Sequence, residues 1–442
     1  MYGLAGRLAN YFIDSKLTPI LILVSLALGL FAIATTPKEE EPQIVVPMID
    51  IMLSYPGASP EEVERRVVVP LEKKLWELKE IEYIYSYAGE GMAVVTARFY
   101  VGTDPVNALV DLNTKMMSAM DLAPPGVVLP PLIKPKSIDD VPILTLTLWG
   151  KNYDWYELRR LAASIENEIK KIQNVSDVFI VGGRPREVRV ILDPQRLEHY
   201  RISPLYVAQV LRSANVQMQS GNLLSQNYEY KVRTGTFFES KKDVENLLLG
   251  VFGGRPVYLK DVADVVDGPS EVKDYVLIGF GPASKDQDVK AGELYAAVTI
   301  AVAKRKGTNA IDVANEVIKL VEHLKGKHLP KDLNITITRN YGKTAKEKSD
   351  ELLKKLFIAT ASVILLIAVT LGIKEAIVVG IAVPVTLSIA LFISEALGFT
   401  LNRVTLFALI FAIGILVDDA IVVVENIHRW FELKLAKDPR EA

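Results

Sequence analysis

Four long stretches with almost no charged residues constrain the fold of this 442-residue chain more than any other feature. They cover residues 17–36, 356–373, 376–394 and 404–424. A helix of about 20 apolar residues spans the ~30 Å hydrocarbon core of a bilayer, so each stretch is long enough to cross a membrane. The charged residues inside them are Asp418 and Asp419, although charged residues make up 24% of the chain. The sequence therefore predicts a membrane protein with a large water-exposed part and excludes a wholly soluble enzyme.

Composition excludes several further classes of protein. The formal net charge is −2, which provides no electrostatic attraction for nucleic acid. The chain has no cysteine, and therefore no disulfide, thiol nucleophile or cysteine-based metal site. His323 and His328 lie near each other, but their spacing does not place them on one helix face as an i, i+4 metal pair requires. We therefore expect no metal site and no cofactor.

The first uncharged stretch is interpreted as an uncleaved helix and not as a signal peptide. Its apolar core is longer than the ~7–15 residues of a signal peptide, and Thr35-Thr36-Pro37 is a poor cleavage site. Seven basic residues flank the spans on one side: Arg7, Lys16, Lys374, Arg429, Lys434, Lys437 and Arg440. The opposite short loop carries Arg403. The side with seven basic residues is expected in the cytoplasm, which places 37–355 outside and both termini inside.

The long segment between the first two spans contains a repeated order of elements. In its first unit, about 38–134, we expect strands at 47–57, 82–89 and 92–101 and helices at 59–78 and 104–120. A second unit combines 140–181 with 292–342. Its expected strands are 142–149, 175–181, 294–303 and 333–339, and its expected helices are 153–172 and 309–324. The second unit repeats strand, helix and strand twice, and the first unit follows the same order as far as its second helix. This order predicts the split-βαβ, ferredoxin-like pattern.

An insert at 183–275 separates the two halves of the second unit. Its expected strands are 187–192, 228–235 and 256–266, and its expected helices are 204–214 and 242–249. Proline-rich segments at 124–126 and 130–131 are interpreted as seams between domains. The acidic run Glu39-Glu40-Glu41 is interpreted as a solvated junction after the first span.

Asp418 and Asp419 are the most informative side chains in the sequence. They lie about 6–8 Å beyond the midpoint of the fourth span, too deep for a short side chain to reach the interface. Each carboxylate costs ~2.5–3.5 kcal/mol to insert near a helix centre unless it is protonated or has polar partners. We expect the pair to bind and release protons as a coupled unit, as a proton-driven machine requires.

Two other interpretations of this pair fit the sequence less well. The helix could end at residue 417 and leave both aspartates at the interface, but the apolar run 420–424 argues against this. A protease dyad needs carboxyl groups on different helices, whereas these two are adjacent on one helix. Pro384 predicts a kink in the third span. Gly380 and Gly414 are interpreted as sites of close helix packing.

The segment 414–426, Gly-Ile-Leu-Val-Asp-Asp-Ala-Ile-Val-Val-Val-Glu-Asn, closely resembles the fourth transmembrane helix of resistance-nodulation-division (RND) efflux permeases. The drug-exporting hydrophobe/amphiphile branch is the best match. Residues 36–44 and 54–58 look like the start of the family's first porter subdomain, and 188–197 looks like the start of its docking domain. The resemblance covers the whole chain.

This resemblance implies an α+β membrane protein with a large periplasmic region and four transmembrane helices. Two ferredoxin-like split-βαβ porter subdomains would occupy 38–134 and 140–181 with 292–342, and an inserted α+β docking domain would occupy 183–275. The helices would span 17–36, 353–373, 376–397 and 404–426, with cytoplasmic segments at 1–16 and 427–442. Family members have twelve spans in two halves, so this chain is expected to be the N-terminal part of a permease.

The resemblance also implies a function. It predicts a secondary active transporter of the bacterial inner membrane, and not an enzyme, that exports drugs or other small amphiphiles with protons as the coupling ion. Its expected partners are two further copies in a homotrimer, a periplasmic adaptor and an outer-membrane channel. Asp418 and Asp419 match the family's proton-relay acids, whose basic partners belong to the second half. A drug-pocket position falls on Val181, with Phe179 nearby, and the docking arm at 224–227 is expected to be short.

Two alternative functions stay open at this stage. A heavy-metal exporter of the same superfamily usually has Asp-Gly where this chain has Asp418-Asp419, and it uses methionines for soft metals. Met116, Met117 and Met120 could serve that purpose, but their spacing is interpreted as helix packing. The other alternative is a non-transporting export or assembly factor with a similar fold.

Overall fold

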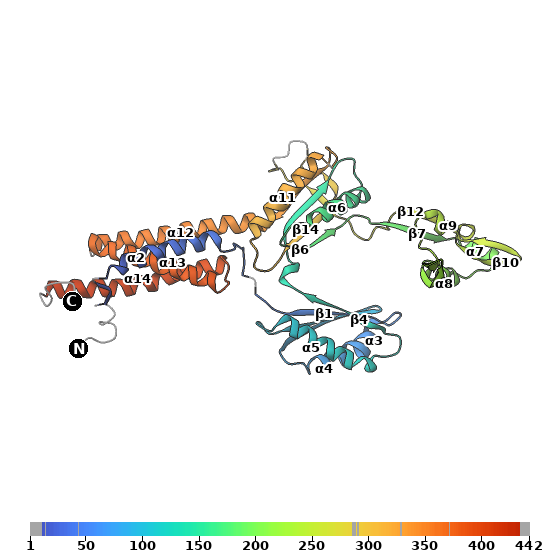
Figure 1. Ribbon diagram of the computed structural model, residues 1–442, viewed down its shortest axis with the longest axis horizontal. Coiled ribbons are helices and arrows are strands. Elements are labelled where there is room, and N and C mark those ends of the chain that lie inside the picture. The colour runs from blue at the N-terminus through green and yellow to red at the C-terminus, as the bar shows by residue number, and fades with distance from the viewer. Residues whose placement is uncertain are drawn as a thin grey trace.

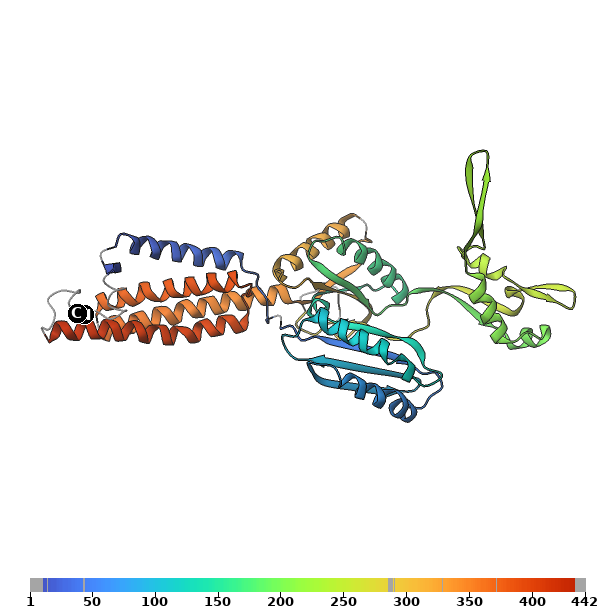
Figure 2. The ribbon, with the colours of Figure 1, turned by 60° about the horizontal axis from the view of Figure 1, so that its bottom comes forward.

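The computed structural model describes residues 11–13, 15–42, 44–284, 289, 291–327, 329–370 and 372–433. This part of the chain is elongated, with a bundle of long helices at one end, two α/β units beside it and a smaller unit at the far end (Figures 1 and 2). Four of the described helices are long and apolar enough to cross a membrane: α2 (Leu17–Thr35), α12 (Tyr341–Thr370), α13 (Ile373–Ala396) and α14 (Arg403–Glu432). The expected mixed helix and strand content with four apolar helices is confirmed.

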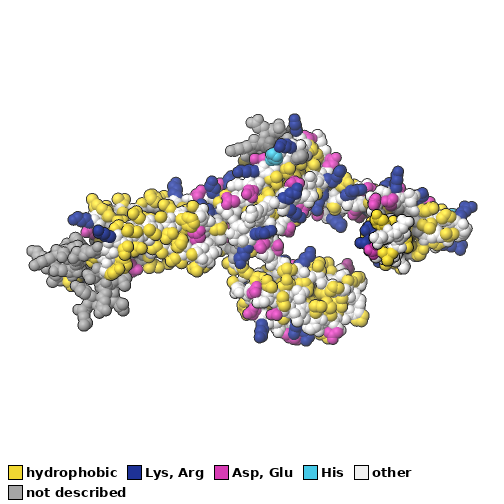
Figure 3. All heavy atoms as spheres, viewed as in Figure 1, with side chains coloured by type: hydrophobic (Ala, Val, Ile, Leu, Met, Phe, Trp, Pro, Cys, Tyr) yellow, Lys and Arg dark blue, Asp and Glu magenta, His cyan; other side chains and the backbone are white. Residues whose placement is uncertain are grey.

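Helix α13 lies in the middle of the bundle and contacts α2, α12 and α14. It continues through Pro384. The bundle surface seen in Figure 3 is covered with apolar side chains along most of its length, whereas charged groups gather at its ends and over the α/β units. Such a surface suits a hydrocarbon environment and would be unfavourable in water.

Close packing within the bundle occurs between α2 and α13. The buried residues of α2 are Ser25, Gly29 and Ala32, and small side chains of this kind let two helices approach closely. Gly380 and Gly414, the two glycines expected to allow close helix packing, do not approach another described helix closely. A Cβ atom placed on Gly380 would make an ordinary 3.5 Å contact with Ile364, and one placed on Gly414 would meet no described atom within 4 Å. Gly414 therefore makes no close helix contact within the described structure.

The first α/β unit is a four-stranded antiparallel sheet covered by helices on one face. Its strands are β1 (Met48–Ser54), β2 (Ile81–Gly89), β3 (Met92–Phe99) and β4 (Val128–Lys136), in the order β2-β3-β1-β4. Helix α3 (Pro60–Val63), a π-helical turn (Glu64–Val68) and α4 (Val69–Leu75) connect β1 to β2, and α5 (Pro105–Ser118) connects β3 to β4. This connectivity and strand order are those of a split βαβ unit.

Local sequence explains these helices. Ser59 accepts a hydrogen bond from the backbone of Glu62 and precedes a proline, and Asp104 caps α5 in the same way. Strand β4 was not expected, because its sequence contains Pro130 and Pro131 and was interpreted as a seam. It lies at the edge of the sheet, where proline is tolerated because no neighbour requires its missing N–H group.

The second α/β unit has the same topology. Its strands are β5 (Pro142–Trp149), β6 (Val175–Val181), β14 (Leu294–Lys304) and β15 (Asn334–Asn340). Strand β14 pairs with β5 and β6, β5 pairs with β15, and the short β13 (Leu277–Gly279) also pairs with β14. Helices α6 (Trp155–Ile169) and α11 (Ala310–Lys327) cover one face, where Leu146, Ile300, Leu158, Ile165 and Val317 form the core.

Helix α12 begins at Tyr341, directly after β15 ends at Asn340. The Asn340 side chain accepts a hydrogen bond of 2.9 Å from the backbone N–H of Lys343, which caps the new helix. The helix thus starts twelve residues before the expected span at 353 and runs without a break from the second α/β unit into the bundle (Figure 1).

The smaller unit is carried by two long antiparallel strands, β7 (Arg186–Leu192) and β12 (Ala263–Pro269). It contains α7 (Pro194–Tyr200), α8 (Pro204–Ala214), β8 (Met218–Ser225), β9 (Tyr228–Thr234), α9 (Lys241–Glu245), β10 (Leu248–Phe252), β11 (Arg255–Tyr258) and α10 (Leu259–Val262). Two expectations were wrong here. The segment 256–266, expected to be one strand, is interrupted by α10. The segment 242–249, expected to be one helix, is helical as far as Glu245 and becomes a strand from Leu248.

The arm expected at 224–227 forms the tip of a longer hairpin. Strands β8 and β9 form a hairpin in which every residue is exposed, and it projects from the rest of the unit (Figure 2). Its turn is made by Gln226 and Asn227, which both have positive φ values, as a two-residue hairpin turn requires. Sequence reasoning missed β8 because neither of its faces is buried and its pattern therefore lacks alternation.

Candidate functional site

Asp418 and Asp419 lie on α14 at the face turned away from the other helices of the described bundle. Val417 and Val424 are buried on the packed face, and Ala420 and Ile421 are partly buried beside α12 and α13. Both aspartates are exposed, on the same side of the helix as large apolar residues that are also exposed: Phe411, Ile415 and Val422. Because α14 continues to Glu432, the alternative in which the helix ends at residue 417 is excluded.

Neither aspartate forms a hydrogen bond or an ion pair with another described residue. The two side chains are adjacent on one helix and diverge by ~100° around its axis, so they do not face each other across a shared site. Their exposed face is therefore open to groups outside the described residues.

Phe179 and Val181 lie on the face of the second sheet that α6 and α11 leave uncovered. Phe179 is 38% exposed and Val181 is 45% exposed. In β6 they stand opposite Ala301 and Thr299 of β14, and directly opposed residues of antiparallel strands point to the same face. The structure thus brings the two predicted pocket residues together on one surface, which we call the open face of the second sheet.

Hydroxyl groups form a row beside them on the open face. The Thr147 hydroxyl lies 2.9 Å from that of Thr299 and 3.0 Å from that of Thr338. The indole N–H of Trp149 donates to Thr336 over 2.9 Å. Because these groups bond to one another, the row is polar without presenting unpaired donors. The open face therefore combines exposed apolar side chains with hydroxyl groups that are satisfied by one another, of which that of Thr147 is buried.

The two candidate sites are far apart in the fold. Asp418 and Asp419 belong to the helix bundle, whereas Phe179 and Val181 belong to the second α/β unit (Figure 1). Any coupling between them has to pass through the segments that join the bundle to that unit.

Glu39 lies in the segment that joins α2 to the first strand of the first α/β unit, and its side chain contacts the second unit. The expectation that its acidic run is solvated was wrong for this residue. Its side chain is 4% exposed and forms an ion pair of 2.5 Å with Lys304, whose side chain is 5% exposed. The sequence signal that could have indicated this pair is a lysine that directly follows the buried strand residues Val302 and Ala303.

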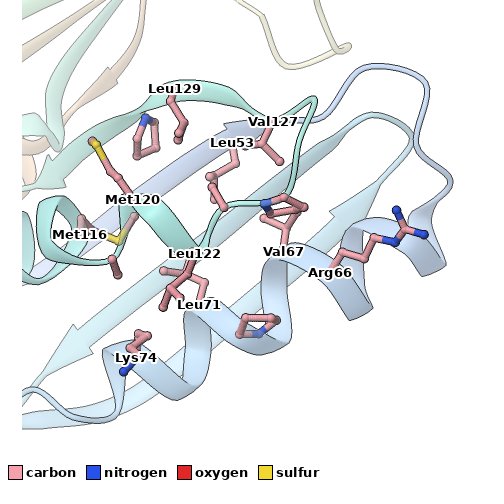
Figure 4. A pocket seen from close by; sticks show the side chains of 15 residues that line it. Leu53, Arg66, Val67, Leu71, Lys74, Met116, Met120, Leu122, Val127 and Leu129 are labelled. Atoms are coloured by element: carbon pink, nitrogen blue, oxygen red, sulfur yellow. The ribbon is translucent and has the colours of Figure 1, made fainter.

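A small cavity of about 60 Å³ lies in the first α/β unit, between α4 and the segment that follows α5 (Figure 4). Met116 and Met120 line it together with apolar residues such as Leu53, whereas Met117 is 70% exposed. The three methionines considered for a soft-metal site therefore do not converge on one point. Among the described residues, no group of three His, Cys, Asp or Glu side chains could hold a metal ion.

Comparison with known proteins confirms the resemblance. The sequence profile of the AcrB/AcrD/AcrF family matches residues 8–442. Multidrug resistance protein MdtC of Yersinia enterocolitica is 28% identical over 424 residues, which cover 95% of this chain and 40% of that protein. MdtC proteins of Yersinia pseudotuberculosis and Yersinia pestis match with the same identity and coverage. The chain thus spans about two fifths of the length of the curated relatives it matches. By the profile match over nearly all of its length, the chain belongs to the AcrB/AcrD/AcrF family of RND permeases.

Proposed function

We propose that this chain is part of a permease that exports amphiphilic compounds across the bacterial inner membrane in exchange for protons. The observation that carries the proposal is the pair Asp418-Asp419, which interrupts an otherwise apolar segment of α14. A carboxyl group at this depth can change its charge by binding a proton. Because its insertion into the membrane is unfavourable, its presence there favours a functional role. The matched relatives are named multidrug resistance proteins, which supports export as the direction of transport.

The proton gradient supplies enough energy for this role. One proton crossing a potential of ~150 mV releases about 3.5 kcal/mol, at ~2.3 kcal/mol per 100 mV. A side chain that changes charge can bias the equilibrium between two conformations by as much as its interactions differ between them. We propose that the exposed face of α14 packs against basic residues from a second half of the permease, as the family resemblance implies.

We assign substrate contact to the open face of the second sheet. Phe179 and Val181 would contact the apolar part of a compound, and the threonine row beside them would tolerate its polar part. In this proposal 37–355 is periplasmic, 38–134 and 140–181 with 292–342 are porter subdomains, and 183–275 is a docking domain. The β8–β9 hairpin would then be available to reach a neighbouring copy in a homotrimer, with a periplasmic adaptor and an outer-membrane channel as further partners.

Asp418→Asn and Asp419→Asn, introduced into the permease expressed from its complete reading frame, test the proton role. Asn keeps the size and hydrogen bonding of the side chain but does not titrate, and it is cheaper to hold in a membrane than a carboxylate. We expect normal amounts of protein in the membrane and dye efflux at background level. Glu425→Gln, which removes a carboxylate further along α14, is the matched control. Normal efflux per molecule in both Asn variants would show that the proton-relay assignment is wrong.

A further inference from the structure

The segment that follows α2 is fixed to the loop between α13 and α14. The backbone N–H of Glu39 donates to the carbonyl of Leu401 over 3.0 Å, and the N–H of Leu401 donates to the carbonyl of Pro37 over 2.9 Å. The carboxylate of Glu40, which follows Glu39, lies 3.3 Å from the guanidinium group of Arg403, the first residue of α14. The start of α14 and this segment therefore have to move together or separate.

The Glu39 carboxylate joins three parts of the chain. One of its oxygens accepts a hydrogen bond from the Lys304 ammonium group at 2.5 Å, and the other accepts one from the Thr400 hydroxyl at 3.1 Å. Burial of both charges is unfavourable, and an ion pair in a low-dielectric site does not by itself increase stability over an apolar pair. A buried pair of this kind is better suited to holding segments in one specific arrangement.

Thr400 connects the carboxylate to α14. Asn402 caps this helix, since its side-chain oxygen accepts the backbone N–H of Thr405 over 3.0 Å and the Thr405 hydroxyl accepts the N–H of Asn402 over 2.9 Å. The Asn402 amide donates to the carbonyl and the hydroxyl of Thr400, and the whole residue is 2% exposed. Displacement of the α14 terminus is thus passed to Thr400 through buried hydrogen bonds.

Lys304 connects the same carboxylate to the open face. It is the last residue of β14, the strand on which Thr299 and Ala301 stand opposite Val181 and Phe179. A strand paired on both sides moves as a unit with its neighbours, so a force on its end reaches the sheet. One carboxylate therefore lies between the helix that carries Asp418 and the strand that lies beside the proposed substrate contacts.

We propose that Glu39 is a positioning residue that couples displacement of α14 to the second sheet. The inference rests on the proposed function, because it assigns a route between its two sites. When protonation shifts α14, the Glu39 contacts to Thr400 and Lys304 carry the shift to β14. Without the carboxylate, both sites keep their own residues but lose this connection.

The test uses the permease from its complete reading frame, reconstituted in proteoliposomes, with Glu39→Gln and Lys304→Met. For each variant we expect transport per molecule to fall at least tenfold, while the dissociation constant for the dye changes less than twofold. The exchange Glu39→Lys with Lys304→Glu should restore transport to within threefold of the wild type, which a role in bulk packing does not predict. Glu41→Gln, an exposed carboxylate two residues away, should transport normally.

Two further variants keep the test decisive. Thr400→Val preserves shape and removes the hydroxyl, so it should fold even if the ion-pair variants do not, and its transport should fall at least threefold. A fluorophore attached to a cysteine that replaces Phe179 should change its emission when Asp418→Asn is introduced into the otherwise wild-type protein. Its emission should not change when Asp418→Asn is introduced into Glu39→Gln. An equal response in both backgrounds, or normal transport in Glu39→Gln and Thr400→Val, overturns the inference. Normal transport in both Asp418→Asn and Asp419→Asn overturns the proposed function instead, whatever the label reports.

Discussion

Replacing Gly29 tests how closely α2 packs against α13. A Cβ atom at this position would lie 2.3 Å from the Cβ atom of Ser388 and 2.7 Å from its Cα atom, whereas carbon atoms pack at about 3.5–4.0 Å. In Gly29→Leu the two helices must therefore separate by roughly 1–1.5 Å, which also loosens the contacts of Ser25 and Ala32. Overpacking of this kind costs ~1–3 kcal/mol. A change of 1.4 kcal/mol alters an equilibrium constant tenfold, so the state in which α2 and α13 are apart should become about 5–150 times more populated, relative to the packed state, than in the parent chain.

Cross-linking in the membrane measures this change directly. Thr35 at the end of α2 donates a hydrogen bond to Glu395 of α13, and the chain has no cysteine of its own. Cysteines at these two positions should form a disulfide quickly in the parent chain and at least fivefold more slowly in Gly29→Leu. Ala34→Leu adds three carbon atoms, one fewer than Gly29→Leu, at an exposed position of α2 and should cross-link at the parental rate. Equal cross-linking in all three proteins would refute the close packing.

Three other expectations concern the water-exposed units and the topology. Hydrogen bonds from Lys115 and a second lysine lower the pKa of Glu77 to about 2, so these contacts stabilise the first unit above pH 4.5 and are lost as the pH falls towards 2. Glu77→Gln should therefore reduce the dependence of the unfolding temperature on pH in that range, and an unchanged dependence would contradict this. In Gly342→Val, a Cβ atom 2.7 Å from an α11 carbonyl should destabilise the junction of α11 and α12 by ~1–3 kcal/mol in chemical unfolding, whereas parental stability would exclude the close approach. A cysteine replacing Lys151 should react with a membrane-impermeant maleimide from the periplasm, whereas one replacing Lys374 should not, and the opposite pattern would reverse the orientation.

Much of the fold could be predicted because local signals agree with the tertiary structure. The bounds of β5 and α8 match their expected ranges residue for residue. The first alternates leucine and threonine in the period of a strand, and the second is preceded by the N-cap residue Ser203 and begins with a proline. The elements that were missed have sequences that tertiary position alone explains. Strand β4 contains prolines that only an edge tolerates, and β8 is exposed on both faces and therefore has no periodicity.

The candidate sites divide in the same way. Asp418 and Asp419 could be found from the sequence because a charge in an apolar helix is unfavourable and therefore conspicuous. The role of Glu39 could not, because its partners Lys304 and Thr400 are 265 and 361 positions away in the chain. The position of Lys304 after an apolar strand segment indicates that it could be buried, but in a sequence with 51 lysines and arginines nothing identifies which acidic residue it meets. Only the three-dimensional arrangement shows that these residues meet.

The absence of a loop between β15 and α12 gives this helix the properties of a lever. Its 30 residues extend about 45 Å at 1.5 Å per residue, and the part before the uncharged stretch accounts for about 22 Å. If the helix tilts by about 5° where it enters the bilayer, the end joined to β15 moves by ~2 Å. That displacement is nearly half of the ~4.8 Å distance between paired strands. A rocking motion that barely disturbs the packing of the bundle is therefore large enough to shift the edge of a sheet.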